Sequence, residues 1–171
     1  MAKKRSAKRR AWNKGIALGQ KDAFTPNQVK RIRQALARRG GSGLRDLALF
    51  SVAIDTMLRG PELLDLTWIA VSDKKRTDYI FPSRRAGSSR PMTVRQLSRL
   101  LKVWIAEAGL NPKKYGHESL RRTKALHILN GTGDIETVRA LLGHMKIEST
   151  ARYLRIAKQS DPIAVARAFD I

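Results

Sequence analysis

The sequence lacks cysteine altogether and is poor in acidic residues. Of its 171 residues, 14 are Asp or Glu, 35 are Lys or Arg and 3 are His. Without cysteine, neither a disulfide framework nor a thiolate metal site can form. The histidines, His117, His127 and His144, do not follow the spacing of metal ligands. We therefore expect no metal and no other cofactor.

Long apolar runs are also missing. No stretch approaches the roughly 20 apolar residues that a membrane span requires. The start of the chain, MAKKRSAKRR, lacks the apolar segment of a secretory signal. Hydrophobic residues nevertheless make up 42% of the chain, which is typical of a globular protein with a core. These features predict a soluble, cytoplasmic protein with no membrane partner.

The excess of basic residues is the strongest feature of the composition. The net charge is +21 and the isoelectric point is near 11.3, which favours a polyanionic partner, usually nucleic acid. Residues 1–22 are predicted to form a flexible basic arm. Its predicted DNA contacts are Lys3, Lys4, Arg5, Lys8, Arg9 and Arg10. Two alternatives are a charge that only keeps the protein in solution and an RNA-binding structural protein, as in a ribosome.

Helical patterns dominate the rest of the chain. Thr25 and Pro26 are typical of a helix N-terminus, and Gly40-Gly41 of a helix end. A single strand signal, LTWIAVSDKKRTDYIF, indicates a small hairpin. The fold class is therefore mainly α with a small antiparallel β-hairpin or sheet (α+β). The predicted helices are 25–39, 44–58, 93–108, 119–129, 135–142 and 148–157, followed by a tail helix at 159–171.

Four separated residues suggest phosphodiester chemistry. Arg59 and Arg121 could bind the non-bridging oxygens of a phosphate and stabilise a pentacoordinate transition state. Tyr153 could act as a nucleophile if the arginines and His144 stabilise its phenolate. Three of them also have a structural explanation: Tyr153 as a core residue, Arg59 at a helix C-terminus and His144 at a helix end.

The order of these residues resembles that of the tyrosine recombinases, or phage-type integrases. LRGPELLDLTW is similar to the first arginine motif of that family, SLRRTKA to the second, and LLGHMKIESTARYL to the Leu-Gly-His box with its tyrosine. The resemblance implies a catalytic domain at 23–158. It also implies catalytic roles for Arg59, Arg121 and His144, with Tyr153 as the nucleophile.

Two positions depart from the family pattern. The second motif normally reads His-x-x-Arg, but Glu118 occupies the histidine position and His117 precedes it. Glu118 could accept hydrogen bonds in the reaction, or His117 could reach in, or Glu118 could only pair with a neighbouring arginine. The family also carries a catalytic lysine on a β-hairpin. Here the hairpin is short, so this role falls to Lys74 or Lys75, or the lysine is missing.

The resemblance implies site-specific recombination or integration of duplex DNA through a 3′-phosphotyrosyl intermediate. Arg84, Arg85 and Arg122 are added to the predicted DNA contacts. We expect self-association on DNA and a location at the nucleoid. The alternative is a relative that has lost catalysis and only binds DNA or a complete recombinase.

Overall fold

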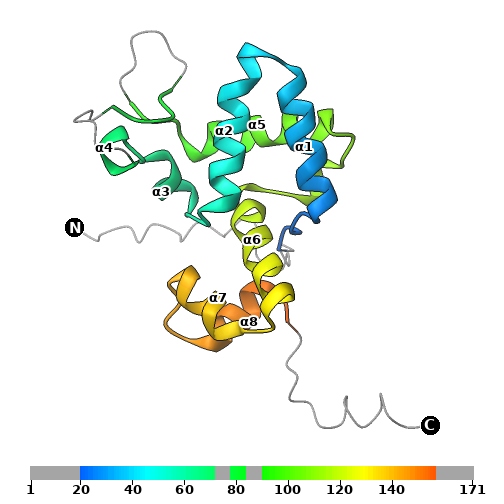
Figure 1. Cartoon of the computed structure of the whole chain (residues 1–171), viewed down its shortest axis with the longest axis vertical. Coiled ribbons are helices and arrows are strands. Elements are labelled where there is room, and N and C mark those ends of the chain that lie inside the picture. The colour runs from blue at the N-terminus through cyan, green and yellow to red at the C-terminus, as the bar shows by residue number, and fades with distance from the viewer. Residues whose placement is uncertain (1–19, 72–77, 84–89, 157–171) are drawn as a thin grey trace, which may run out of the picture.

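The computed structural model of the chain describes residues 20–71, 78–83 and 90–156, which are mainly helical (Figure 1). None of the helices in these ranges has both the length and the apolarity to cross a membrane. The elements are α1 (Pro26–Arg38), α2 (Gly41–Asp55), α3 (Gly60–Leu64), α4 (Trp68–Val71), α5 (Val94–Glu107), the 3₁₀ turn η1 (Pro112–Lys114), α6 (His117–Thr132), α7 (Ile135–Leu142) and α8 (Ile147–Leu154).

Side-chain caps set several helix starts where the sequence predicts them. At the start of α1, Thr25 accepts a hydrogen bond from the Gln28 N–H, and the Gln28 side chain accepts one from the Thr25 N–H. Thr93 caps α5 in the same way, and Asp134 caps α7. Such reciprocal bonds satisfy amide groups that have no partner within the helix. The predicted helices 25–39, 93–108 and 135–142 are therefore confirmed.

A large apolar cluster holds α1, α2, α3 and α5 together. The Trp104 side chain is fully buried at its centre, and its indole N–H donates to Asp46 at 3.1 Å. The Phe50 ring packs edge-on against Trp104. The other fully buried side chains of this cluster include Ile32, Leu36, Leu49, Leu97 and Ile105.

A second, smaller cluster lies between α6, α7 and α8, below the large one in Figure 1. Its buried members are Met57, Ala125, Val138, Leu142 and Leu154. Helix α6 belongs to both clusters, since Leu120 packs in the large one and Ala125 in the small one. This helix therefore sets how the two parts of the molecule are placed.

The prediction of a first hairpin strand is wrong over residues 68–71. These residues form the helical turn α4, and the described residues contain isolated antiparallel bridges, Thr67 with Tyr79 and Pro82 with Pro91, but no sheet. Trp68 and Ile69 remain 38% and 56% exposed. Strand preference in β-branched and aromatic residues comes from packing on a sheet face, and here no such face covers them. The hairpin turn at 73–76 lies outside the described residues.

Several helix boundaries also differ from the sequence expectation. Helix α2 begins at Gly41, before the predicted Leu44, and α6 extends in both directions beyond 119–129. Helix α8 ends at Leu154 because Arg155 adopts a left-handed conformation with φ of 59°. The tail helix expected at 159–171 lies outside the described residues.

Candidate active site

Arg59 lies at the start of α3, directly after the turn that follows α2. Glu62 accepts a hydrogen bond from the Arg59 backbone N–H at 2.8 Å and one from the Arg59 guanidinium at 3.3 Å. The Arg59 side chain is 57% exposed. A carboxylate in the first turn favours the helix N-terminus, and here it also orients a cation that solvent can reach.

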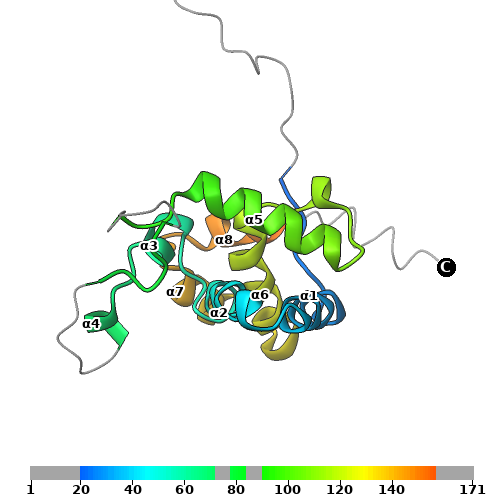
Figure 2. The same ribbon diagram turned by 90° about the horizontal axis from the view of Figure 1, so that it is seen from above.

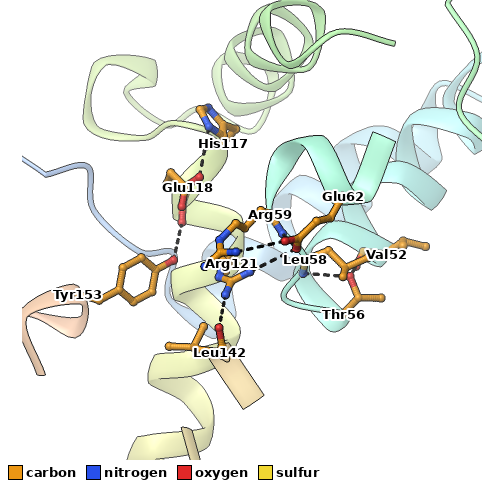
Figure 3. Close-up of polar contacts among 10 residues, drawn as sticks. All are labelled: Val52, Thr56, Leu58, Arg59, Glu62, His117, Glu118, Arg121, Leu142 and Tyr153. Atoms are coloured by element: carbon orange, nitrogen blue, oxygen red, sulfur yellow. Dashed lines mark hydrogen bonds and ion pairs between the residues drawn. The ribbon is translucent and has the colours of Figure 1, made fainter. Parts of the chain in front are cut away.

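Arg121 also contacts the Glu62 carboxylate, but its side chain, unlike that of Arg59, is buried. Its Nη1 lies 3.8 Å from Glu62 Oε2, and its Nη2 donates to the Leu142 carbonyl at 2.6 Å. Figure 3 shows the two guanidinium groups side by side between α3 and α6. The structure thus brings together the two arginines that the sequence separates by about one third of the chain. A pair of this kind can hold the two non-bridging oxygens of a phosphate.

His144 follows Gly143, the residue that ends α7. Gly143 has φ of 65°, a conformation that costs glycine little. The His144 ring nitrogen Nδ1 lies 3.0 Å from the Thr150 hydroxyl, and its backbone is bonded to Arg139. Burial, together with the nearby charges of Arg121 and Arg59, lowers the pKa of His144. The imidazole is therefore neutral at physiological pH.

Tyr153 lies on α8 with its ring pointing towards the first turn of α6 (Figure 3). Its hydroxyl donates to the Glu118 carbonyl at 3.5 Å, a long and weak hydrogen bond. The His144 ring packs edge-on at a centroid distance of 5.5 Å. Burial and the Glu118 carboxylate raise the pKa of Tyr153 to about 12, against the opposite effect of the arginines. At neutral pH the phenol keeps its proton.

His117 and Glu118 form a pair at the start of α6. The His117 Nε2 lies 3.3 Å from Glu118 Oε1, and Nδ1 lies 3.4 Å from the Ser98 hydroxyl. The hydrogen bond from His117 is the main cause that lowers the pKa of Glu118, and burial opposes it. His117 also packs closely on Gly60, where an added Cβ would meet the imidazole at 3.2 Å. The pair is therefore adjacent to the Arg59 backbone.

Arg122 is 3% exposed and contacts protein on two sides. Its Nη1 donates to the Lys21 carbonyl, and its guanidinium carbon lies 4.9 Å from the centroid of the Tyr153 ring. Burial is the main cause that lowers the pKa of Arg122. The DNA contact expected of Arg122 stays a prediction, because the described contacts of its side chain are with protein.

The remaining predicted site residues lie outside the described residues. These are Lys3, Lys4, Arg5, Lys8, Arg9, Arg10, Lys74, Lys75, Arg84 and Arg85. No cluster of three or more His, Asp or Glu side chains suited to a metal ion occurs within residues 20–71, 78–83 and 90–156.

Sequence reasoning missed two of the residues that shape the site. Thr150 is fully buried and contacts His144. Its position three residues before Tyr153, on the same face of a helix, was the available signal. Lys21 contributes a backbone carbonyl, which no side-chain pattern could have indicated.

Comparisons with known proteins identify the family of the chain. A sequence model of the phage integrase family matches residues 70–160, more than half of the chain. A tyrosine recombinase XerC of Erythrobacter litoralis is 31% identical over 136 residues, covering 68% of this chain and 43% of that protein. A tyrosine recombinase XerD of Haemophilus ducreyi is 28% identical over 127 residues, covering 74% and 41%. The chain thus spans about two fifths of the length of these relatives.

Solved structures show the same fold. The crystal structure of a XerA recombinase matches with a TM-score of 0.64 and 20% identity, over 87% of this chain and 64% of that chain. A XerH site-specific recombinase in a post-cleavage complex with a palindromic difH substrate matches with a TM-score of 0.65 and 16% identity, over 88% and 54%. At these identities the likeness concerns the fold alone.

Proposed function

Because the chain belongs to the phage integrase family, we propose that it cleaves and rejoins duplex DNA as a site-specific tyrosine recombinase. The observation that carries this proposal is the meeting of Arg59 and Arg121 at Glu62, on α3 and α6, with Tyr153 and His144 beside α6. Four residues from distant parts of the sequence are thereby assembled for one reaction. DNA cleavage explains all four together better than four separate structural roles do.

The proposed step is an in-line displacement at phosphorus. The phosphate lies between the guanidinium groups of Arg59 and Arg121, which bind its non-bridging oxygens and stabilise the charge of the transition state. The Tyr153 oxygen forms a bond to phosphorus as the bond to the 5′-oxygen breaks. The phenol loses its proton and the leaving 5′-oxygen gains one, which yields a 3′-phosphotyrosyl link and a free 5′-hydroxyl. Attack by a 5′-hydroxyl of another strand reverses the step.

The other predicted residues are assigned around this step. His144 donates a hydrogen bond to the phosphate, because its neutral imidazole is held by Thr150 beside Tyr153. The pair of His117 and Glu118 occupies the position of the family histidine. We assign the protonation of the 5′-oxygen to Lys74 or Lys75. The basic residues of the arm, together with Arg84 and Arg85, bind backbone phosphates without reading bases.

Assembly and location follow from the same proposal. Strand exchange needs two DNA sites in one complex, so the chain self-associates on DNA. It acts in the cytoplasm, at the nucleoid, because its substrate is there.

The alternative is a relative that binds DNA without cleaving it. The observation in its favour is Glu118 in the histidine position, since its carboxylate raises the pKa of the nucleophile. Such a protein would keep the arginines for phosphate binding. The two functions differ in one product, the covalent adduct.

A nicked suicide duplex tests the proposal. Cleavage beside the nick releases a short fragment, so the protein–DNA adduct accumulates and is seen on a denaturing gel. We expect an adduct with the chain and none with Tyr153→Phe, whose DNA affinity should stay within a few-fold because only a hydroxyl is lost.

Tyr79→Phe is the matched control and should leave the adduct unchanged. An adduct that persists in Tyr153→Phe shows that another residue is the nucleophile. A chain that binds the duplex but forms no adduct at any pH supports the DNA-binding alternative instead.

A further inference from the structure

Residues 20–24, which we call the strap, precede α1 and run beside α6 (Figures 1 and 2). The Asp22 N–H donates to the Lys114 carbonyl at 2.9 Å, and the Lys21 ammonium donates to the Lys113 carbonyl at 2.7 Å. Phe24 is 2% exposed, and its ring stacks on Tyr115 at a centroid distance of 4.2 Å. The strap is therefore anchored to η1 and to the large apolar cluster.

The strap also contacts the C-terminal end of α8, the helix that carries Tyr153. Arg155, the residue that ends α8, donates through Nη1 to Asp22 Oδ1 at 3.1 Å and through Nε to Gln20 Oε1 at 3.2 Å. Its φ of 59° is uncommon for a residue with a Cβ, and other contacts have to offset the free energy that this conformation costs. Arg155 lies two residues after Tyr153, so these contacts fix the end of the helix turn that carries the nucleophile.

The strap also reaches the Tyr153 ring through Arg122. The Lys21 carbonyl accepts a hydrogen bond from Arg122 Nη1, and the same guanidinium packs against the Tyr153 ring. Arg122 is almost completely buried, so its attraction to the ring is little weakened by water. Its Nε has no hydrogen-bond partner among the described residues. The Lys21 carbonyl and the ring therefore decide where this guanidinium lies.

Resting on the function proposed above, we propose that the strap positions the nucleophile. Asp22 holds the end of α8 through Arg155, and the Lys21 carbonyl holds Arg122 against the Tyr153 ring. Asp22, Arg155 and Arg122 are positioning residues, because they act on the reacting oxygen only through Tyr153. An ion pair as exposed as that of Asp22 and Arg155 adds little to folding stability, whereas a small misplacement of a reacting group lowers a rate strongly.

The test compares Asp22→Ala with Asp55→Ala in the full chain. Asp55 pairs with Arg33 at 3.0 Å with side-chain exposures of 54% and 38%, and Asp22 pairs with Arg155 at 3.1 Å with 49% and 46%. Both variants lose one negative charge and an exposed ion pair with an arginine, and Asp55→Ala also loses a longer contact with Lys124 at 3.9 Å. No contact of Asp55 described here is with Tyr153 or with α8. At saturating nicked duplex, Asp22→Ala should form the adduct about fivefold more slowly than Asp55→Ala. DNA affinity and melting temperature should be alike in the two variants.

A charge exchange provides the second measurement. Asp22→Arg should slow adduct formation at least as much as Asp22→Ala, and the double variant Asp22→Arg with Arg155→Asp should recover most of the rate. Recovery supports positioning through the ion pair. Equal rates in Asp22→Ala and Asp55→Ala overturn the proposal.

Hydrogen exchange separates failure of this proposal from failure of the proposed function. If the unmodified chain forms no adduct, the function is wrong, but the strap is still tested by amide exchange of residues 147–156. Faster exchange there in Asp22→Ala than in Asp55→Ala supports the strap as the element that holds α8. Equal exchange overturns it.

Discussion

The large and the small apolar cluster hold different parts of the proposed site. Arg59 follows α2 and lies at the start of α3, both packed in the large cluster, whereas His144 and Tyr153 lie around the small one. The large cluster is centred on Trp104 and Phe50, and the small one has five buried members among the residues that the structure describes. Less buried apolar area means a lower free energy of local opening. The region that holds Arg59 is thus expected to be the more stable, and the region that holds Tyr153 the more easily displaced.

The contacts between the two regions then decide the geometry of the proposed site. Arg121 joins them directly, since its guanidinium contacts Glu62 on α3 and the Leu142 carbonyl at the end of α7. Arg122, in the next position, contacts the Tyr153 ring. Two neighbouring arginines of α6 therefore link the proposed phosphate site to Tyr153, the proposed nucleophile, and changes in each region should have separable effects.

Trp104→Ala should cause the largest loss, because it empties the centre of the large cluster and removes a hydrogen bond from the buried Asp46. We expect a decrease of about 3–5 kcal/mol in the free energy of unfolding. Urea denaturation followed by far-ultraviolet circular dichroism measures it. The matched control is Trp68→Ala, since Trp68 is 38% exposed. Similar losses in both variants would contradict the central place given to Trp104.

Arg121→Ala should lower the rate of adduct formation by about 10²–10³-fold, the usual cost of removing one donor to transition-state charge. Arg121→Lys should restore only part of the rate, because an ammonium cannot bind two oxygens in the planar geometry of a guanidinium. Single-turnover assays on the nicked duplex measure both. Arg33→Ala, on α1, controls for the lost charge. A rate for Arg121→Ala equal to that of the control would remove Arg121 from the phosphate site.

Val138→Ala should lower the free energy of opening the small cluster by about 2 kcal/mol. The two γ-methyl groups are lost and a cavity remains in their place. Amide exchange should become faster in α7 and α8 and stay unchanged in α1 and α5. Val103→Ala, on the exposed face of α5, is the control with the same atoms removed and 47% exposure. Uniformly faster exchange across all helices would mean that the two clusters unfold as one unit.

Glu118→Gln should have the smallest effect and the opposite sign. Removing the carboxylate takes away one cause of the raised pKa of Tyr153, so more phenolate is present at any pH below about 12. We expect adduct formation to become roughly tenfold faster at most, the factor for one pKa unit. Glu136→Gln, which lies in the first turn of α7, is the control for the charge change. A slower Glu118→Gln would instead show that the carboxylate takes part in the reaction.

Local patterns in the sequence predicted most helix positions and the family to which the chain belongs. Thr25, Thr93 and Asp134 start helices because their side chains satisfy amides within the next three residues, an interaction that a short window contains. The order of the arginine, histidine and tyrosine motifs likewise indicated the phage integrase family, which the family match confirms. The roles of the individual site residues stay predictions.

Other features were decided only by the tertiary structure. Trp68–Val71 is helical although its composition favours a strand, because strand preference depends on a sheet face that is absent around these residues in the described part of the chain. Arg122 is buried against Tyr153 and bonded to Lys21, a residue 101 positions earlier. The sequence by itself determined the features that depend on residues close together along the chain, such as the helix starts. The packing of distant segments decided where Tyr153 and the arginines lie, since contacts between such segments exist only in the folded chain.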